Sequence, residues 1–123
     1  DAIIDIKESK FKFGTTKKTA AELPNPAELF LSSFAACVLK NVERFSGFLQ
    51  FEYDKATIKV SAFRLENPPR MEGIHYELTV FSKDEKLRIE LLKKNIEKFG
   101  TIFNTVQKAC SITGSIIKKE DYV

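Results

Sequence analysis

The stretch 25–46 constrains the fold most strongly, because it predicts a long helix that is apolar on nearly every side. Asn25 suits the N-cap, Pro26 suits the first helical position, and Glu28 stands where a capping box places its carboxylate. Between positions 29 and 39 only two serines are polar, so this part of the helix must be covered on most sides. The stretch therefore predicts the centre of a hydrophobic core, with one thiol in the middle of the helix.

Length and charge narrow the class of protein. The 123 residues suffice for one real core, so we expect a single domain spanning 1–123. The formal charge of +3, from 20 basic and 17 acidic residues, is mild and spread along the chain, which argues against a nucleic-acid partner. Lys40 interrupts the apolar run before about 18 residues accumulate, so burial inside protein is favoured over a membrane span.

Cysteine usage predicts a cytoplasmic protein. Only Cys37 and Cys110 could form a disulfide, which is not the framework of a secreted mini-protein, and no hydrophobic signal segment opens the chain. The chain begins at Asp1 without Met, as expected of a processed or N-terminally shortened form.

Before Asn67 the spacing of hydrophobic residues predicts two short strands, the long helix and then a further strand. Residues 2–6 and 11–13 alternate as two short strands of an edge hairpin, a turn at 14–16 follows the second strand, and Gly47 is the expected stop of the long helix. A period of two then runs from Phe51 to Glu66. Its parity changes near Ala62, which indicates either a bulge or a strand covered on both faces.

The second half predicts a long hairpin, two helices and a last strand. A loop at 67–73 precedes a strand at 74–80 that pairs back on 51–66. Ser82 or Asp84 is expected to cap an amphipathic helix that Gly100 ends, and its buried side comprises Leu87, Ile89, Leu91, Leu92, Ile96 and Phe99. A short helix at 101–108 and a final strand at 111–122 follow.

Three segments together carry a family pattern. They are Pro26-Ala-Glu-Leu-Phe-Leu-Ser-Ser-Phe-Ala-Ala-Cys37, then Pro68-Pro-Arg with Ile74-His75, and Glu97-Lys-Phe-Gly-Thr-Ile-Phe-Asn-Thr105. In this order they resemble the OsmC/Ohr family of osmotically inducible and organic-hydroperoxide-resistance proteins, over nearly the whole chain. The helix with its Pro-x-Glu-Leu…Ala-Cys pattern is the most specific part and favours the OsmC-like branch.

The resemblance implies an α+β fold in which an antiparallel sheet packs around a long buried central helix and two chains intertwine as a homodimer. It also implies active sites at the subunit interface, where a reactive cysteine on the long helix reduces organic hydroperoxides or hydrogen peroxide and then forms a disulfide with a second cysteine. Thiol reductants, in some members a lipoylated protein, recycle the enzyme. We expect no cofactor.

Carried over residue by residue, the resemblance fits Cys37 to the reactive cysteine and Glu28 to the glutamate of the helix pattern. The second family cysteine would fall at Gly100, so it is missing here. Family members also tend to place an arginine ahead of the long helix, whereas the first arginine of this chain is Arg44. Cys110 is the remaining candidate for a relocated second cysteine.

Thiol chemistry explains why those departures matter. A thiolate attacks peroxide, and an unperturbed cysteine with a pKa of about 8.5 supplies only a few per cent of it at neutral pH. A cation or hydrogen-bond donor must therefore approach Cys37, since the helix dipole fades within about one turn of Asn25. Glu28 and Cys37 point to opposite sides of a straight helix, so either Glu28 of the partner subunit reaches the site or Glu28 only caps the helix.

Two functions stay open. The first is a thiol-dependent peroxidase of oxidative-stress defence, with Cys37 as the more reactive thiol and its sulfenic acid reduced by Cys110 or, as we expect, by an external thiol. The second is a non-catalytic dimer of the same fold that binds a small apolar ligand, with Cys37 as a small buried hydrophobe and Cys110 structural. His75 is the sole histidine, so we expect no metal site.

Overall fold

The computed structural model describes residues 1–121, which form two compact units, Asp1–Ser32 and a second that begins at Ser33. The chain order of the elements is β1 (Ala2–Ile6), β2 (Ser9–Phe13), the short 3₁₀ helix η1 (Lys17–Thr19), α1 (Pro26–Phe48), β3 (Lys55–Leu65), β4 (Arg70–Phe81), α2 (Ile89–Phe99), α3 (Thr101–Gln107) and β5 (Ile112–Lys119). This mixture confirms the α+β class. The single domain expected over 1–123 stays a prediction.

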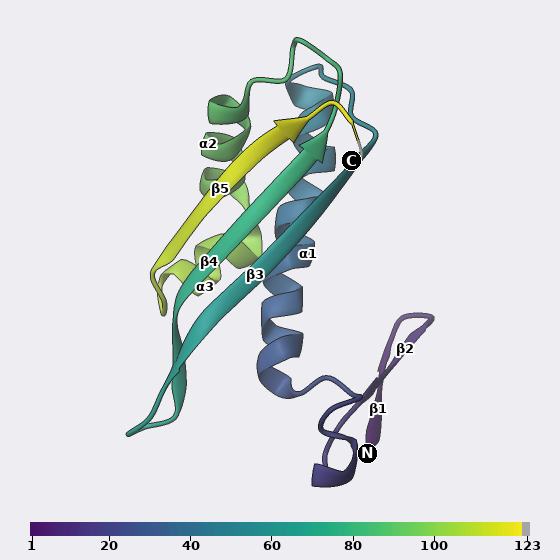
Figure 1. Ribbon diagram of the computed structural model, residues 1–123, viewed down its shortest axis with the longest axis vertical. Coiled ribbons are helices and arrows are strands. Elements are labelled where there is room, and N and C mark those ends of the chain that lie inside the picture. Colours follow the sequence, from purple (N-terminus) through teal and green to yellow (C-terminus); the bar gives the residue numbers. More distant parts are fainter. Residues whose placement is uncertain (122–123) are drawn as a thin grey trace. The chain divides into compact units, whose positions relative to one another are not determined.

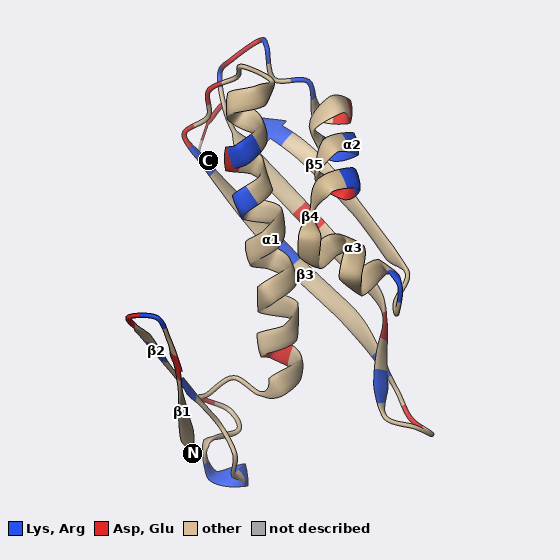
Figure 2. Cartoon of the chain, turned by 180° about the vertical axis from the view of Figure 1, so that it is seen from behind, with Lys and Arg blue, Asp and Glu red and all other residues tan. Residues whose placement is uncertain are grey.

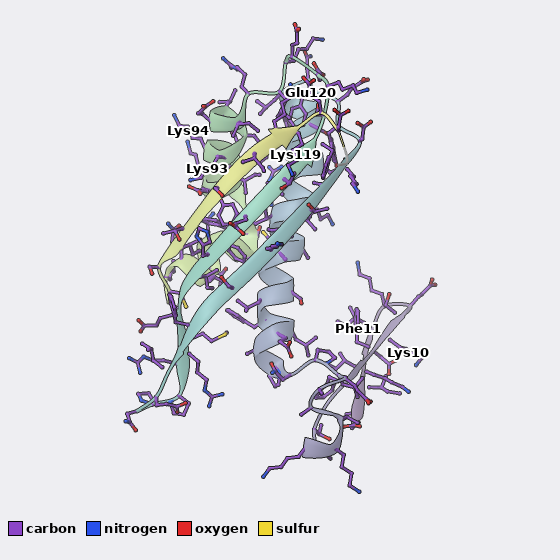
Figure 3. All side chains as sticks on the ribbon, viewed as in Figure 1. Lys10, Phe11, Lys93, Lys94, Lys119 and Glu120 are labelled. Atoms are coloured by element: carbon purple, nitrogen blue, oxygen red, sulfur yellow. The ribbon has the colours of Figure 1, made fainter. Side chains whose placement is uncertain are left out.

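The first unit contains the predicted N-terminal hairpin. β1 and β2 pair antiparallel from Ala2 opposite Phe13 to Ile6 opposite Ser9. The turn that joins the two strands contains Lys7, whose φ is 55°. Figure 3 shows Lys10 extending from β2, and its ammonium lies 2.6 Å from an Asp5 carboxylate oxygen in an exposed ion pair.

Helix α1 begins as predicted and ends later than predicted. The Asn25 side chain accepts the Glu28 N–H at 2.9 Å, and the Glu28 carboxylate accepts the Asn25 N–H at 3.0 Å, which completes a capping box. Gly47 does not stop the helix. The left-handed residue is Gln50, with φ 56°, and the Phe51 N–H bonds back to the Ser46 carbonyl at 3.0 Å in a Schellman-type end.

The predicted long hairpin is confirmed by the antiparallel pairing of β3 with β4. The register shifts between Ser61 and Phe63, so the parity change near Ala62 is a bulge. The predicted loop at 67–73 is shorter, because β4 already begins at Arg70. Opposite the bulge, Gly73 has φ 64°, and a Cβ there would lie 3.0 Å from the Phe63 ring, so both backbone and space favour glycine.

The sheet is mixed rather than purely antiparallel, because β5 runs parallel to β4, from Ile112 opposite Ile74 to Lys119 opposite Phe81. A crossover through α2 and α3 joins the two strands, and parallel neighbours require such a crossover. The final strand expected at 111–122 is therefore confirmed in its central part, while Tyr122 lies outside the described residues.

Helix α2 starts at Ile89, later than the cap predicted at Ser82 or Asp84. The Ser82 hydroxyl donates to the Glu52 carbonyl, and the Asp84 carboxylate accepts the backbone N–H groups of Glu52 and Lys86. These hydrogen bonds hold a turn against the segment after α1 instead of starting a helix. The bonds from Lys86 and Glu52 also lower the pKa of Asp84.

In the second unit the three helices cover one face of the β3–β4–β5 sheet, as the front and back views show (Figures 1 and 2). One face of β4 is fully or almost fully buried, and it comprises Ile74, Tyr76, Leu78 and Val80. Helix α1 contributes a stripe of buried side chains, Phe34, Val38, Asn41, Val42 and Phe45. The core thus lies between the sheet and one side of α1.

Candidate functional site

Cys37 lies in the middle of α1 as a half-buried free thiol. Its helical neighbours Phe34 and Val38 are fully buried, so the packing of α1 on the sheet fixes the position of the sulfur. Asn41 follows one turn later and Arg44 about two turns later, and residues at this spacing share one helix face. Cys37 therefore has polar neighbours on its own helix.

The Asn41 side chain lies within hydrogen-bonding distance of the sulfur. Its side-chain N–H group lies 2.8 Å from the Cys37 carbonyl and 3.6 Å from the Cys37 Sγ, and only 8% of the residue is exposed. Sequence reasoning missed this residue. The signal was available, since Asn41 is the one amide in an otherwise apolar stripe, four residues after the thiol.

A hollow of about 540 Å³ opens beside Cys37. Residues of α1 line one side, and residues at the junction of α2 and α3 line the other. The lining comprises Cys37, Lys40, Asn41, Glu43, Arg44, Phe99, Thr101 and Ile102. Phe99, predicted to be buried, is 43% exposed in the single chain and forms part of this lining.

Gly100 lies directly against the sulfur. A Cβ built on Gly100 would be 3.3 Å from the Cys37 Sγ, and across a disulfide the Cβ-to-sulfur separation is about 3 Å. The backbone of Gly100 has φ −69° and ψ 119°, which any residue adopts. A thiol at this position would therefore reach Cys37, and the glycine leaves the sulfur without an intramolecular thiol at this point.

Two cations line the hollow beside Cys37. Lys40 and Arg44 are both exposed, and both border the hollow. The Arg44 guanidinium lies over the rings of Phe45 and Phe48, at 5.2 and 5.9 Å from their centroids. Figure 2 shows basic positions only in the C-terminal half of α1, and these two are its only basic residues.

The acidic residue of the hollow has another partner. The Tyr53 hydroxyl donates a hydrogen bond to the Glu43 carboxylate. Burial, with this bond and the Glu43 charge, raises the pKa of Tyr53 to about 12. Within residues 33–121 neither Lys40 nor Arg44 forms an ion pair, and with Glu43 the lining carries two positive charges and one negative charge.

A buried tyrosine ties the sheet to α2 behind the site. The Tyr76 hydroxyl lies 2.7 Å from a Glu97 carboxylate oxygen, and its ring packs against Phe34 and Phe103. Burial, followed by this bond and the Glu97 charge, raises the pKa of Tyr76 far above its usual value. The Lys93 ammonium lies 3.0 Å from Glu97, and Figure 3 shows Lys93 and Lys94 on α2.

The other predicted site residues lie elsewhere. Glu28 caps α1 and belongs to the first unit. Cys110 follows the end of α3, a helix about 10 Å long that begins at Thr101, directly after Gly100, and the Cys110 Sγ contacts the Met71 carbonyl at 3.4 Å. Both cysteines are free. Catalytic roles for Glu28 and Cys110 stay predictions.

No metal centre or membrane span is present in the described part of the chain. Among residues 1–121 no group of three or more His, Cys, Asp and Glu side chains could hold a metal ion. The His75 ring lies 2.8 Å from the Thr113 hydroxyl on the sheet. No helix in residues 1–121 is long and apolar enough to cross a membrane.

Comparison with known proteins identifies the family. The sequence profile described as OsmC-like protein matches residues 18–115, most of the chain. The chain belongs to the OsmC-like protein family. The match includes α1 with Cys37 and the α2–α3 junction with Gly100, so the hollow lies within the family region.

Individual OsmC-like relatives agree with this assignment. A hydroperoxide reductase from Mycoplasma genitalium is 25% identical over 101 residues, which cover 76% of this chain and 72% of the relative. An OsmC-like protein from Mycoplasma pneumoniae superposes with a TM-score of 0.83 at 18% identity, over 96% of this chain and 88% of that one. An organic hydroperoxide resistance protein from Legionella pneumophila gives 0.62 at 14% identity, over 91% and 82%. The two structural matches establish the OsmC-like fold.

Proposed function

We propose that this OsmC-like protein is a thiol-dependent peroxidase that reduces organic hydroperoxides or hydrogen peroxide at Cys37 in oxidative-stress defence. The observation that carries the proposal is the Cys37 sulfur, which lines an open hollow and receives the Asn41 N–H. A hydrogen-bond donor supports negative charge on sulfur, which the attacking thiolate needs. Family membership and the hydroperoxide reductase relative support the same chemistry.

The proposed reaction begins with attack of the Cys37 thiolate on a peroxide oxygen. A sulfur–oxygen bond forms as the oxygen–oxygen bond breaks, and the leaving oxygen takes a proton to become an alcohol or water. Sulfur is thereby oxidised to a sulfenic acid. A reductant thiol then attacks that sulfur, water leaves, and a mixed disulfide forms; a second thiol releases Cys37 and a free disulfide.

The reductant comes from outside the chain in this proposal. Gly100 supplies no thiol at the one position shown to lie within disulfide reach of Cys37, and α3 separates Gly100 from Cys110. A small thiol or a lipoylated protein is therefore the expected electron donor, in the cytoplasm.

A homodimer is part of the proposal. Helix α1 is apolar around most of its circumference between positions 29 and 39, yet in the single chain only one stripe is buried. Within residues 33–121 further large apolar side chains are exposed beside the hollow, namely Phe48, Phe99 and Ile102. In this proposal a second chain packs on the exposed side of α1 and buries part of this apolar surface, as globular domains require of apolar helix faces, while the hollow stays open at the edge of the interface.

A turnover assay tests the function. The full chain, mixed with tert-butyl hydroperoxide and dithiothreitol, should consume peroxide and thiol in a ratio of one peroxide per dithiol oxidised. Cys37→Ser should abolish turnover and Cys110→Ser, the matched control, should retain it. Equal loss in both variants, or turnover that survives Cys37→Ser, contradicts the proposal.

The alternative is a non-catalytic dimer that binds a small apolar ligand. The apolar side of the hollow, with Phe99 and Ile102, and the absence of a second thiol at Gly100 favour it. It predicts no peroxide consumption by the wild type, together with saturable binding of an apolar fluorescent probe that Ile102→Asp weakens.

A further inference from the structure

The charge of the hollow beside Cys37 bears on which thiol reduces the oxidised sulfur, an inference that rests on the proposed peroxidase function. After oxidation, a reductant sulfur must approach the Cys37 Sγ through open space. The hollow provides that space, and Cys37, Asn41 and Ile102 are among its lining. Whatever enters also meets the other side chains of the lining, so these determine which thiols bind well.

Two of those side chains are cations held on the same helix as the sulfur. Lys40 lies one turn beyond Cys37, and Arg44 lies about 10 Å beyond it along the axis of α1. The rings of Phe45 and Phe48 lie beneath the Arg44 guanidinium, which restricts its position at the rim of the hollow.

The only carboxylate of the lining offsets one of these two positive charges and leaves the other. Glu43 accepts the Tyr53 hydroxyl hydrogen, and no ion pair within residues 33–121 involves Lys40 or Arg44. Two cations and one engaged carboxylate leave a net positive rim around a partly apolar hollow. An anionic group on the entering molecule would find charge-assisted hydrogen bonds there, with Arg44 able to bind a carboxylate with two parallel bonds.

We propose that the reductant of oxidised Cys37 is a small thiol that carries a carboxylate, which Lys40 and Arg44 bind while its sulfur reaches the Cys37 sulfenic acid. The reductant sulfur bonds to the Cys37 sulfur and the sulfenic oxygen leaves as water. A second thiol, or the second thiol group of the same molecule, then releases Cys37 and forms a disulfide. Each cycle oxidises two thiol groups and reduces one sulfenic acid.

A matched pair of dithiols tests the charge preference. Dihydrolipoate and dihydrolipoamide have the same dithiol, and they differ in a carboxylate or a neutral amide at the far end. The full chain is first oxidised at Cys37 with one equivalent of neutral cumene hydroperoxide, and the rate at which each dithiol restores the free thiol is then measured. We expect dihydrolipoate to react about five- to tenfold faster at low salt, as two exposed ion pairs allow, with the ratio falling as salt rises.

Charge-removing variants test whether Lys40 and Arg44 cause the preference for the carboxylate-bearing dithiol. Lys40→Gln and Arg44→Gln should each lower the rate ratio towards one. Lys94→Gln removes the same charge from the exposed face of α2, outside the lining of the hollow, and should preserve the ratio. A wild-type ratio near one, a preference for the amide, or a ratio that Arg44→Gln leaves unchanged would overturn the inference. The amide also represents a lipoylated protein, whose lipoyl carboxyl is bound as an amide.

Two further outcomes distinguish a failure of the charge preference from a failure of the proposed peroxidase function. If the two cations instead bind a carboxylate-bearing hydroperoxide, the variants will slow oxidation by an anionic hydroperoxide and leave the dithiol ratio intact, which contradicts the thiol assignment. If cumene hydroperoxide does not oxidise Cys37 at all, the proposed function fails and the inference fails with it. Oxidation of Cys37 followed by charge-independent reduction contradicts the inference alone.

Discussion

Gly100, which lies against the Cys37 sulfur, bears on how a sulfenic acid at Cys37 would be reduced in the proposed reaction. Gly100 lies close enough that its missing Cβ would be 3.3 Å from the sulfur. The Asn41 N–H also contacts the sulfur, and it can support a thiolate but cannot reduce a sulfenic acid. Under the proposed peroxidase function, the side chain at position 100 would therefore decide whether a neighbouring thiol or a thiol from solution reduces oxidised Cys37.

Gly100→Cys should supply the missing thiol. We expect one equivalent of hydroperoxide to give a disulfide between Cys37 and the introduced thiol, seen by mass spectrometry, and protection of Cys37 from over-oxidation. The new Cβ lies 3.0 Å from both the Ile96 carbonyl and Phe103, so the reduced variant should lose about 1–3 kcal/mol of unfolding free energy. Gly47→Cys, which meets nothing within 4 Å, is the control and should form no such disulfide.

Gly114 shows a second position where a side chain would decide stability. A Cβ on Gly114 would lie 2.0 Å from the Tyr76 ring, which crosses the glycine on the neighbouring strand. We expect Gly114→Ala to lower the unfolding free energy by about 3 kcal/mol or more. Gly47→Ala, in open space on a helix, should be neutral or stabilising by up to about 1 kcal/mol. Urea unfolding of both variants checks this, and an equal effect would contradict the packing described for Tyr76.

The Tyr76 hydroxyl gives a pH dependence. Its pKa is raised in the folded chain, so the folded state keeps the phenol proton at a pH where the unfolded state releases it. Stability from this group is therefore complete below about pH 10 and falls above it, by up to about 1.4 kcal/mol per pH unit. Tyr76→Phe should lack that fall. Urea unfolding at pH 9 and pH 11 measures this fall in unfolding free energy. An equal fall for wild type and Tyr76→Phe would contradict the burial and hydrogen bonding of Tyr76.

At the scale of elements, the sequence predicts where α1 begins better than where it ends. The capping box depends on two side chains three residues apart, so local spacing reveals it. The end depends on burial of Phe51, which draws the left-handed residue to Gln50 and carries the helix through Gly47. The late start of α2 has a similar cause, since the Asp84 carboxylate binds the backbone of Glu52, 32 residues away in the chain.

The candidate site was also predicted in part from the sequence. The family pattern located Cys37 and the position of Gly100, and both lie together in the structure. The sequence did not reveal that Lys40 and Arg44 border the hollow, because an exposed side chain on an amphipathic helix can also border a depression formed with another helix. Parallel pairing of β5 was missed for a related reason, since strand direction depends on the crossover and not on the strand's own residues.

The capping box can be tested by removing each partner. Asn25→Ala should lower the unfolding free energy by about 1 kcal/mol, because the Glu28 N–H loses its acceptor. Glu28→Gln keeps an acceptor oxygen for the Asn25 N–H and should cost less. Urea denaturation compares the two, and a larger loss for Glu28→Gln would contradict the capping role. Peroxide turnover of the folded Glu28→Gln protein decides whether the carboxylate is also catalytic.

At the scale of the whole molecule, the exposed apolar surface of one chain predicts self-association. Sedimentation at micromolar concentration should give a dimer. Phe48→Glu places a charge on a side chain that is 72% exposed beside the hollow, and it should shift the protein towards monomer. Ile117→Glu is the control, since Ile117 is exposed on the sheet face opposite the helices and should leave the dimer intact. A cooperatively folded wild-type monomer would contradict the proposed dimer.

The most direct test of Cys37 chemistry is a single oxidation of the full chain. The protein is treated with one equivalent of hydroperoxide without added thiol, trapped with a sulfenic-acid reagent, and mapped by mass spectrometry. The peroxidase account predicts an adduct on Cys37, over-oxidation of Cys37 when peroxide is in excess, and a free Cys110. An adduct confined to Cys110, or a Cys37–Cys110 disulfide formed in high yield, would contradict it.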